Sequence, residues 1–182
     1  MSNREKLKQI ILEKSYEKKK VTLSSGIESD FYFDGKQSTL HPEGSYLTGK
    51  LFFDSIRNID GIDGVGGLTL GADPIATATS LVSYLEGQPI PAFIIRKEPK
   101  GHGTGAWLEG GKNLPHGARV VIVEDVVTSG GSSLKAIRRA EEEGLLVLGV
   151  VTLVDREEGG RENIEKAGYW LKAIFTKSDI LA

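Results

Sequence analysis

Residues 118–133 read ARVVIVEDVVTSGGSS and combine a β-branched run, two acids and a loop of small residues. The run at 120–123 is typical of a central parallel strand. The strand is expected to end at Glu124 and Asp125, because their charges do not belong in a core. The turn that follows offers backbone N–H groups and hydroxyls to one phosphate at a helix N-terminus. The segment therefore predicts an α/β protein with a phosphate-binding loop at the carboxyl end of a strand.

The two acids narrow the kind of phosphate ligand. A P-loop needs a lysine directly after its glycines, and a dinucleotide-binding fingerprint needs GxGxxG with its acid much further along; this segment has neither. Acids just before a monophosphate loop suit a ribose 5-phosphate, with Glu124 and Asp125 accepting hydrogen bonds from the ribose hydroxyls. The alternative is a surface junction of strand and helix with incidental acids.

The arrangement resembles the phosphoribosyl diphosphate (PRPP) motif of the type I phosphoribosyltransferases, in which two adjacent acids precede a loop of small residues. The resemblance implies that PRPP is bound by both acids and by the whole loop after them. The implied loop residues are Val126, Val127, Thr128, Ser129, Gly130, Gly131 and Ser132.

Composition excludes several other classes of protein. A net charge of −2 over 182 residues and a pI near 6.0 argue against general nucleic-acid binding. The chain has no cysteine, and its histidines, His41, His102 and His116, are too scattered to form a metal site. No signal peptide or long apolar span is apparent, so a cytoplasmic protein without a membrane partner is expected.

The remaining sequence alternates helical and strand patterns, which predicts a central parallel sheet flanked by helices in a single domain, residues 1–182. Helical patterns cover residues 3–18, 42–58, 73–86 and 134–143, with Asp73 as the expected N-cap of the third. Strand patterns cover residues 21–23, 31–34, 64–67, 91–96, 119–123, 146–154 and 169–175. Residues 1–36 are expected to form an N-terminal helix and a small flap over the sheet, with the lysines at 18–20 as a solvated helix end.

A second informative segment, residues 94–105, reads IIRKEPKGHGTG. It places Arg96, Lys97, Lys100 and His102 within seven residues, among glycines that allow a loop to close on an anion. These groups exceed what a 5-phosphate needs and suit diphosphate; the alternative is a solvated charged loop. The pattern resembles the catalytic loop of orotate phosphoribosyltransferases, which implies that Lys100 and His102 stabilise or protonate the leaving diphosphate.

Residues 66–74, GGLTLGADP, place glycines between a strand and a helix. Their backbone amides suit diphosphate binding, although a tight turn explains the glycines nearly as well. The matching loop of the family can carry a tyrosine and a lysine, and Leu70 and Gly71 occupy those places here. The resemblance therefore shifts more of the diphosphate binding to Arg96 and Lys97.

The base is expected to bind elsewhere. Residues 22–35, TLSSGIESDFYFDG, resemble the flap of orotate phosphoribosyltransferases, which implies that Tyr32 and Phe33 cover the orotate ring, although such aromatics are more often core. Ser24 stands where the family often has a lysine. Arg156 follows the strand at 148–154 and can bind a carboxylate through two hydrogen bonds; the alternative is a surface ion pair with Asp155 or Glu157. By the same resemblance, Thr128 neighbours the orotate ring.

On these four motifs the chain is identified as a member of the orotate phosphoribosyltransferases. The resemblance implies transfer of the phosphoribosyl group of PRPP to orotate, giving orotidine 5′-monophosphate and diphosphate in UMP synthesis. It implies Lys100, His102 and Asp125 as catalytic residues, Mg²⁺ carried in by PRPP without a dedicated protein metal cage, and a homodimer with shared active sites. Two alternatives remain open: an enzyme of the same fold for another base, and a regulator that kept the PRPP site and lost catalysis.

Overall fold

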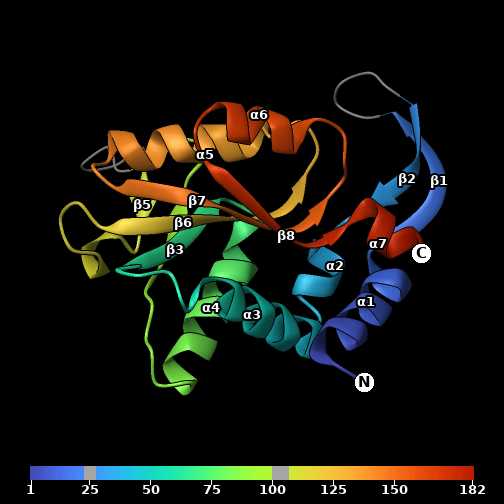
Figure 1. Ribbon diagram of the computed structural model, residues 1–182, viewed down its shortest axis with the longest axis horizontal. Helices are drawn as coiled ribbons and strands as arrows, with labels where there is room; N and C mark the ends of the chain where they lie inside the picture. The colour runs from blue at the N-terminus through green and yellow to red at the C-terminus, as the bar shows by residue number, and fades with distance from the viewer. Residues whose placement is uncertain (23–27, 100–106) are drawn as a thin grey trace.

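A six-stranded sheet organises the computed structural model, which describes residues 1–22, 28–99 and 107–182 (Figure 1). The strand order is β5-β4-β3-β6-β7-β8, and every neighbouring pair is parallel except β4 with β5. The strands are β3 (Gly64–Leu68), β4 (Ala92–Ile95), β5 (Leu108–Glu109), β6 (Arg119–Val127), β7 (Leu146–Asp155) and β8 (Trp170–Thr176). The predicted central parallel sheet is confirmed.

Helices cover both faces of the sheet. In Figure 1, α3 (Pro42–Ile56) and α4 (Ala72–Leu85) lie on one side, and α5 (Gly131–Glu142) and α6 (Gly160–Lys166) lie on the other. Alternate residues of β6 belong to two different core clusters: Val121 and Val123 join the cluster with α3 and α4, and Val120 and Ile122 join the one with α5. A strand buried on both faces needs apolar residues at every position, which explains the β-branched run.

The N-terminal region differs from the expected helix at 3–18. Helix α1 (Asn3–Lys14) begins with a capping box between Ser2 and Glu5, and the chain then enters β1 (Tyr16–Thr22). This strand pairs antiparallel with β2 (Glu28–Phe33), and the Tyr16 and Phe31 ring centroids lie 5.1 Å apart. Cross-strand aromatic packing therefore outweighs the helical pattern, and the lysines at 18–20 belong to a strand rather than to a helix end.

The hairpin of β1 and β2 forms its own two-stranded sheet and stands beside the main sheet (Figure 1). A short helix that the sequence did not predict, α2 (Lys36–Thr39), follows it directly and leads into α3. The C-terminal helix α7 (Lys177–Leu181) was also not predicted, and it lies next to the hairpin in Figure 1. The chain thus turns from the hairpin toward the sheet at Gly35 and Lys36.

Helix α4 begins two residues earlier than the expected N-cap at Asp73 implies. Its N-cap is Gly71, and the carboxylate of Asp73 instead accepts a hydrogen bond of 2.7 Å from the Thr69 hydroxyl. Asp73 therefore holds the preceding loop rather than capping the helix.

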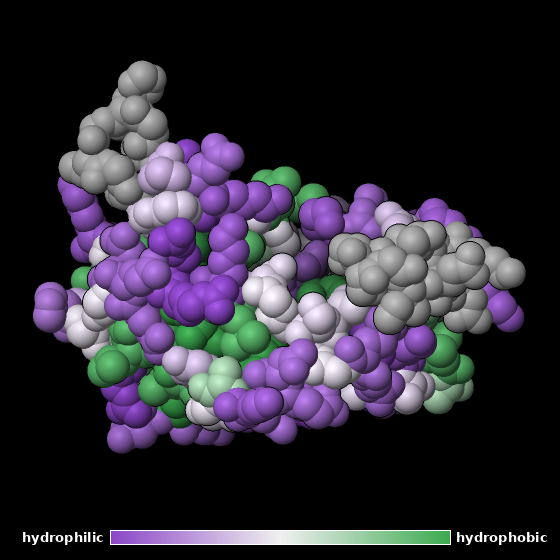
Figure 2. Space-filling model, turned by 90° about the horizontal axis from the view of Figure 1, so that it is seen from above, coloured by the Kyte–Doolittle hydropathy of each residue, from purple (hydrophilic) through white to green (hydrophobic). Residues whose placement is uncertain are grey.

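The surface is polar over most of the face drawn in Figure 2, with hydrophobic side chains in smaller areas. In the described ranges, no helix combines the length and the apolar character that a membrane crossing requires.

Candidate active site

The acid pair, Glu124 and Asp125, lies inside β6 rather than beyond its end. The strand continues to Val127, and its pairing with β7 includes Glu124 opposite Thr152. Glu124 is only 6% exposed, so the expectation that both charges leave the core was wrong for this residue. Burial, and then the neighbouring charge of Asp125, raise the pKa of the Glu124 carboxyl well above its usual range. A glutamate that holds its proton more readily can remain buried, while the side chain of Asp125 is 14% exposed.

The predicted phosphate loop connects β6 to α5. Gly130 is the N-cap of this twelve-residue helix and has φ of +80°, and a Cβ there would lie 2.9 Å from the carbonyl oxygen of Gly160. The Asn163 side chain donates a 3.0 Å hydrogen bond to the Ser129 carbonyl. Ser129 and Ser132 are exposed. The loop is therefore braced by α6 while its polar side faces solvent at a helix N-terminus, as an anion site requires.

The loop after β3 touches the acid pair through its backbone. A Cβ on Gly71 would lie 2.5 Å from Oδ1 of Asp125 and 3.1 Å from Oε1 of Glu124. Gly66 and Gly67 instead lie against neighbouring strands, where a Cβ would meet the carbonyl oxygens of Phe93 and Val123. The glycines of this segment thus have two purposes: two permit strand packing, and Gly71 permits contact between the loop and the acids.

Lys36 also reaches the acid pair, and the sequence interpretation missed it. Its Nζ lies 2.7 Å from Oδ1 of Asp34 and 3.7 Å from Oδ2 of Asp125. The hydrogen bond that the ammonium donates to Asp34, together with the charges of Asp125 and Asp34, raises the pKa of the lysine. A Cβ on Gly35 would lie 2.9 Å from Cβ of Asp125, so the backbone is also close. The available signal was a Gly-Lys pair directly after an aromatic strand.

The described residues of the basic segment at 94–105 include Arg96 and Lys97, which lie beside the loop between β3 and α4. Arg96 follows β4 and pairs with Oε1 of Glu109 at 2.9 Å, and Lys97 is exposed. A hollow of about 640 Å³ is lined by Arg96, Lys97, Thr69 and Asp73, among others. The structure thus brings Arg96 and Lys97 next to the loop that touches the acids. Lys100 and His102 lie outside the described residues.

The two predicted base-covering aromatics differ in their surroundings. Phe33 is mostly buried and stacks on Phe31, with ring centroids 6.1 Å apart. One edge of its ring approaches the site, because its Cε1 lies 3.2 Å from where a Gly35 Cβ would stand. Tyr32 is half-buried, and Nζ of Lys19 lies 4.0 Å from its ring centroid. Only Tyr32 therefore presents a large ring surface outside the core.

Arg156 is buried rather than part of a surface ion pair, and only 5% of it is exposed. Its Nε lies 3.2 Å from Oε1 of Glu158, and its Nη2 donates a 3.1 Å hydrogen bond to the Phe31 carbonyl. Its guanidinium carbon lies 5.3 Å from the Phe31 ring centroid. Arg156 therefore joins the end of β7 to the aromatic hairpin. Thr128, on the phosphate loop, is half-buried.

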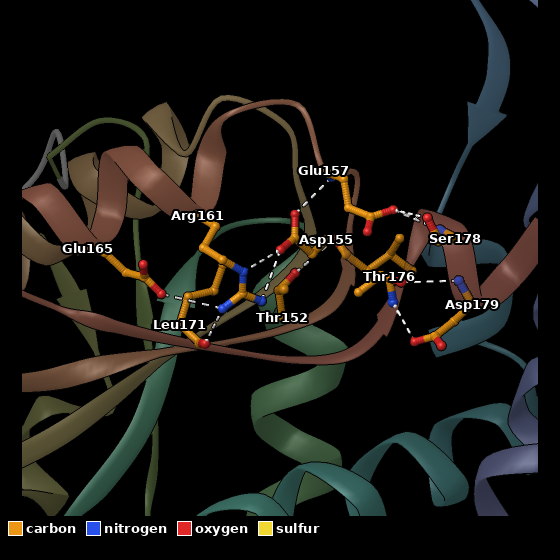
Figure 3. Close-up of polar contacts among 10 residues, drawn as sticks. Thr152, Asp155, Glu157, Arg161, Glu165, Leu171, Thr176, Ser178 and Asp179 are labelled. Carbon is orange, nitrogen blue, oxygen red and sulfur yellow. Dashed lines mark hydrogen bonds and ion pairs between the residues drawn. The ribbon is translucent and has the colours of Figure 1, made fainter.

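The residues on either side of Arg156 are held by separate contacts (Figure 3). Asp155 is 2% exposed and accepts hydrogen bonds from Nε of Arg161 at 3.1 Å and from the Glu157 backbone at 2.9 Å. The Glu157 carboxylate accepts hydrogen bonds from the backbone and hydroxyl of Ser178. Both neighbours are thus fixed to other elements, which limits the positions that Arg156 can adopt.

Comparison with known proteins gives the family. Residues 66–174 match the family described as "Phosphoribosyl transferase domain". The chain is 49% identical over 184 aligned positions to an orotate phosphoribosyltransferase from Aquifex aeolicus (strain VF5), covering 100% of this chain and 99% of that protein.

Solved structures agree. The chain superposes with a TM-score of 0.85 and 40% identity on orotate phosphoribosyltransferase of Mycobacterium tuberculosis H37Rv in complex with Fe(III) dicitrate, covering 98% of this chain and 99% of that one. The complex of the same enzyme with PRPP gives a TM-score of 0.82 at 37% identity over all of both chains. Sequence and fold agree over nearly the whole length, and the chain belongs to the orotate phosphoribosyltransferases.

Proposed function

We propose that the protein transfers the 5-phosphoribosyl group of PRPP to N1 of orotate, giving orotidine 5′-monophosphate and diphosphate in UMP synthesis, with residues 1–182 acting as a single domain. The observation that carries the proposal is the convergence on Asp125: the loop at Gly71 and the ammonium of Lys36 both reach this carboxylate, at the edge of the sheet where the phosphate loop begins. Ribose, diphosphate and 5-phosphate sites are therefore neighbours.

The phosphoribose is held by the acids and the loop. Residues 126–132 bind the 5-phosphate through backbone N–H groups and hydroxyls at the N-terminus of α5. Asp125 accepts hydrogen bonds from the ribose hydroxyls, and a protonated Glu124 can also donate one. Positive charge develops on the ribose as the C1–O bond to diphosphate breaks and N1 of orotate attacks C1. The Asp125 carboxylate stabilises that charge, which makes it a catalytic group.

The diphosphate is bound on the opposite side of the acid pair from the phosphate loop. Arg96 and Lys97 line the hollow beside Thr69 and Asp73, which is large enough for this anion. The resemblance to the family's catalytic loop assigns Lys100 and His102 to protonating the departing diphosphate or stabilising its charge.

The base is recognised by Arg156, Thr128 and the aromatic hairpin. Orotate bears a carboxylate, and a guanidinium is the side chain best suited to bind it through two parallel hydrogen bonds. Arg156 lies at the end of β7, next to β6, and contacts the hairpin that carries Tyr32 and Phe33. The Tyr32 ring and the edge of Phe33 nearest Gly35 cover the planar base, with Thr128 at its rim.

Mg²⁺ enters with PRPP. Within the described ranges, no three side chains of His, Cys, Asp or Glu are grouped as a metal site. The donors at the acid pair are carboxylate oxygens, which suit a magnesium ion that keeps most of its water and is shared with substrate phosphates. When bound, the ion offsets the negative charge of the leaving diphosphate. The chain's own contribution is to hold the ribose and the diphosphate in place.

The active enzyme is a homodimer in which the basic loop serves the neighbouring site. An apolar stripe supports this assembly: Leu81, Tyr84 and Leu85 lie on one face of α4, Leu70 lies in the loop just before the helix, and all four are more than half exposed. A groove of about 480 Å³ between this stripe and Leu40 continues it. Surfaces of this kind on a soluble protein favour burial against another protein, here a second copy. We further propose that the enzyme is cytoplasmic and has no nucleic-acid or membrane partner.

The test is an assay with PRPP, Mg²⁺ and one base at a time, following base consumption and diphosphate release. Orotate is expected to be consumed, and uracil, adenine and hypoxanthine to be left unchanged, because they lack the carboxylate that Arg156 binds. Turnover of a purine with orotate untouched would support the enzyme for another base. Binding of PRPP without turnover of any base would support the regulator.

A further inference from the structure

The loop between β3 and α4 brings a backbone, but no cationic side chain, to the acid pair. Residues 69–73 read Thr, Leu, Gly, Ala and Asp. Leu70 is 64% exposed and points its apolar side chain toward the groove beside α4, while Gly71 lies against Asp125. A diphosphate bound here would meet the carboxylates of Asp125 and Asp73, and residues 69–73 offer only backbone N–H groups to balance them, while Arg96 and Lys97 line the hollow on its other side from β4.

Lys36 supplies a cation to this position from a different part of the chain. It stands at the start of α2, directly after the hairpin, and its Nζ lies 3.7 Å from Oδ2 of Asp125. Gly71 approaches Oδ1 of the same carboxylate, so the lysine and the loop lie on its two sides. Lys36 also lines the groove together with Leu70 and Asp73. One side chain thus borders both the acid pair and the loop.

The ammonium is held in place and still accessible. Asp34 binds it at 2.7 Å, and the side chain of Lys36 remains 42% exposed. The ion pair with Asp34 keeps the lysine charged, and the exposed fraction leaves donors free to turn toward a ligand, since an ammonium has three. Because Lys36 is already fully protonated beside two carboxylates, it does not need to take up a proton when an anion binds.

We propose that Lys36 is a PRPP-binding residue that contacts the diphosphate, in place of the cationic side chain that the loop at residues 69–73 lacks. The inference rests on the proposed function, because it requires that PRPP binds at the acid pair. The competing role for Lys36 is purely structural: it would join the hairpin to β6 through Asp34 and Asp125 and touch no substrate.

The experiment compares two ligands that contain a diphosphate group with two that contain the ribose 5-phosphate but no diphosphate. Calorimetry with Mg²⁺ measures the affinities of PRPP, inorganic diphosphate, ribose 5-phosphate and orotidine 5′-monophosphate for the unmutated protein, Lys36→Gln and Lys36→Arg. Lys50→Gln is the matched control, because Lys50, on α3, is also ion-paired to two acids, Asp54 of the same helix and Glu86 at the end of α4.

Lys36→Gln is expected to weaken PRPP and diphosphate binding about 10- to 100-fold, the range for losing a charge-assisted hydrogen bond to phosphate. Its affinities for ribose 5-phosphate and orotidine 5′-monophosphate should stay within about twofold, and Lys36→Arg should retain most PRPP affinity. Equal weakening of all four ligands, or no weakening of PRPP, would overturn the inference. If the Lys36 inference fails in this way but the unmutated protein still turns over PRPP, the proposed function stands. If the unmutated protein does not bind PRPP at all, both the Lys36 inference and the proposed function are overturned.

A second measurement needs no variant and covers the case in which Lys36→Gln does not fold. The unmutated protein is acetylated with an amine-reactive reagent, with and without diphosphate and Mg²⁺, and each lysine is quantified by mass spectrometry. Diphosphate is expected to protect Lys36 and not Lys50, whereas ribose 5-phosphate protects neither. Equal labelling of Lys36 with and without diphosphate would contradict the contact.

Discussion

Gly71 lies so close to Asp125 that a single added methyl group would stand 2.5 Å from Oδ1 of the carboxylate. The contact joins the loop after β3 to the acid pair of β6, two segments separated by more than fifty residues. It means that the positions of the two proposed anion sites are coupled through one glycine.

Gly71→Ala should therefore displace the Asp125 carboxylate or the loop. We expect a loss of about 1–3 kcal/mol in the free energy of unfolding, the usual cost of overpacking, and a rise in KM for PRPP. Urea denaturation and steady-state kinetics measure the two effects. Gly111→Ala is the control, because a Cβ there meets its nearest atom at an ordinary 3.6 Å. A Gly71→Ala enzyme with unchanged KM would show that the contact is not part of the PRPP site.

Glu124 predicts how stability depends on pH. Its pKa is raised by burial and by Asp125, so the folded state keeps the proton at pH values where the unfolded chain has already lost it. The stabilising contribution of protonated Glu124 to the free energy of unfolding is fully present below the pKa that Glu124 has in the unfolded chain. It is lost as pH rises through the higher pKa that Glu124 has in the folded protein. Glu124→Gln removes this titration, so its unfolding free energy relative to the unmutated protein should increase from pH 4.5 to pH 8 in urea denaturation. A difference that is constant over this range would contradict a raised pKa.

The contact between Arg161 and Asp155 predicts a larger effect on KM for orotate than on KM for PRPP. Arg161→Met leaves the buried Asp155 carboxylate without its ion pair and should cost about 3 kcal/mol. Loss of this support beside Arg156 should raise KM for orotate more than KM for PRPP. Arg138→Met, on the exposed side of α5, provides the comparison. Equal rises in both KM values would mean that the substitution acts only through general destabilisation.

Much of the fold was predictable from the sequence, because the apolar run at residues 120–123 and the glycine-rich turn are local patterns. The prediction that Glu124 lies outside the core was wrong. Its burial depends on the neighbouring strand and on the raised pKa of its carboxyl, and a strand pattern in the sequence contains no information on either. Lys36 was missed because its partner Asp125 is distant in sequence and only the fold brings them together. The ion pair of Arg156 with Glu158 likewise depends on a turn geometry that no periodicity specifies.

The shared active site can be tested by mixing two inactive variants. Lys100→Ala and Asp125→Asn chains, unfolded together and refolded, should form heterodimers in which one site has both an intact loop and an intact acid pair. Activity should recover to about one quarter of that of the unmutated dimer after random pairing, since half of the dimers are mixed and each has one complete site. Verified subunit exchange without recovery would remove the proposal that the loop serves the partner.

The account depends most directly on Asp125 as the ribose-binding acid of an orotate phosphoribosyltransferase. The decisive measurement is the rate of orotidine 5′-monophosphate formation from PRPP and orotate by the unmutated protein and by Asp125→Asn, both shown to be folded by circular dichroism. The unmutated protein should form the nucleotide, and Asp125→Asn should be slower by about 100-fold or more, the usual scale for losing a group that stabilises developing charge. Full activity in Asp125→Asn, or no product from the unmutated protein, would contradict the account.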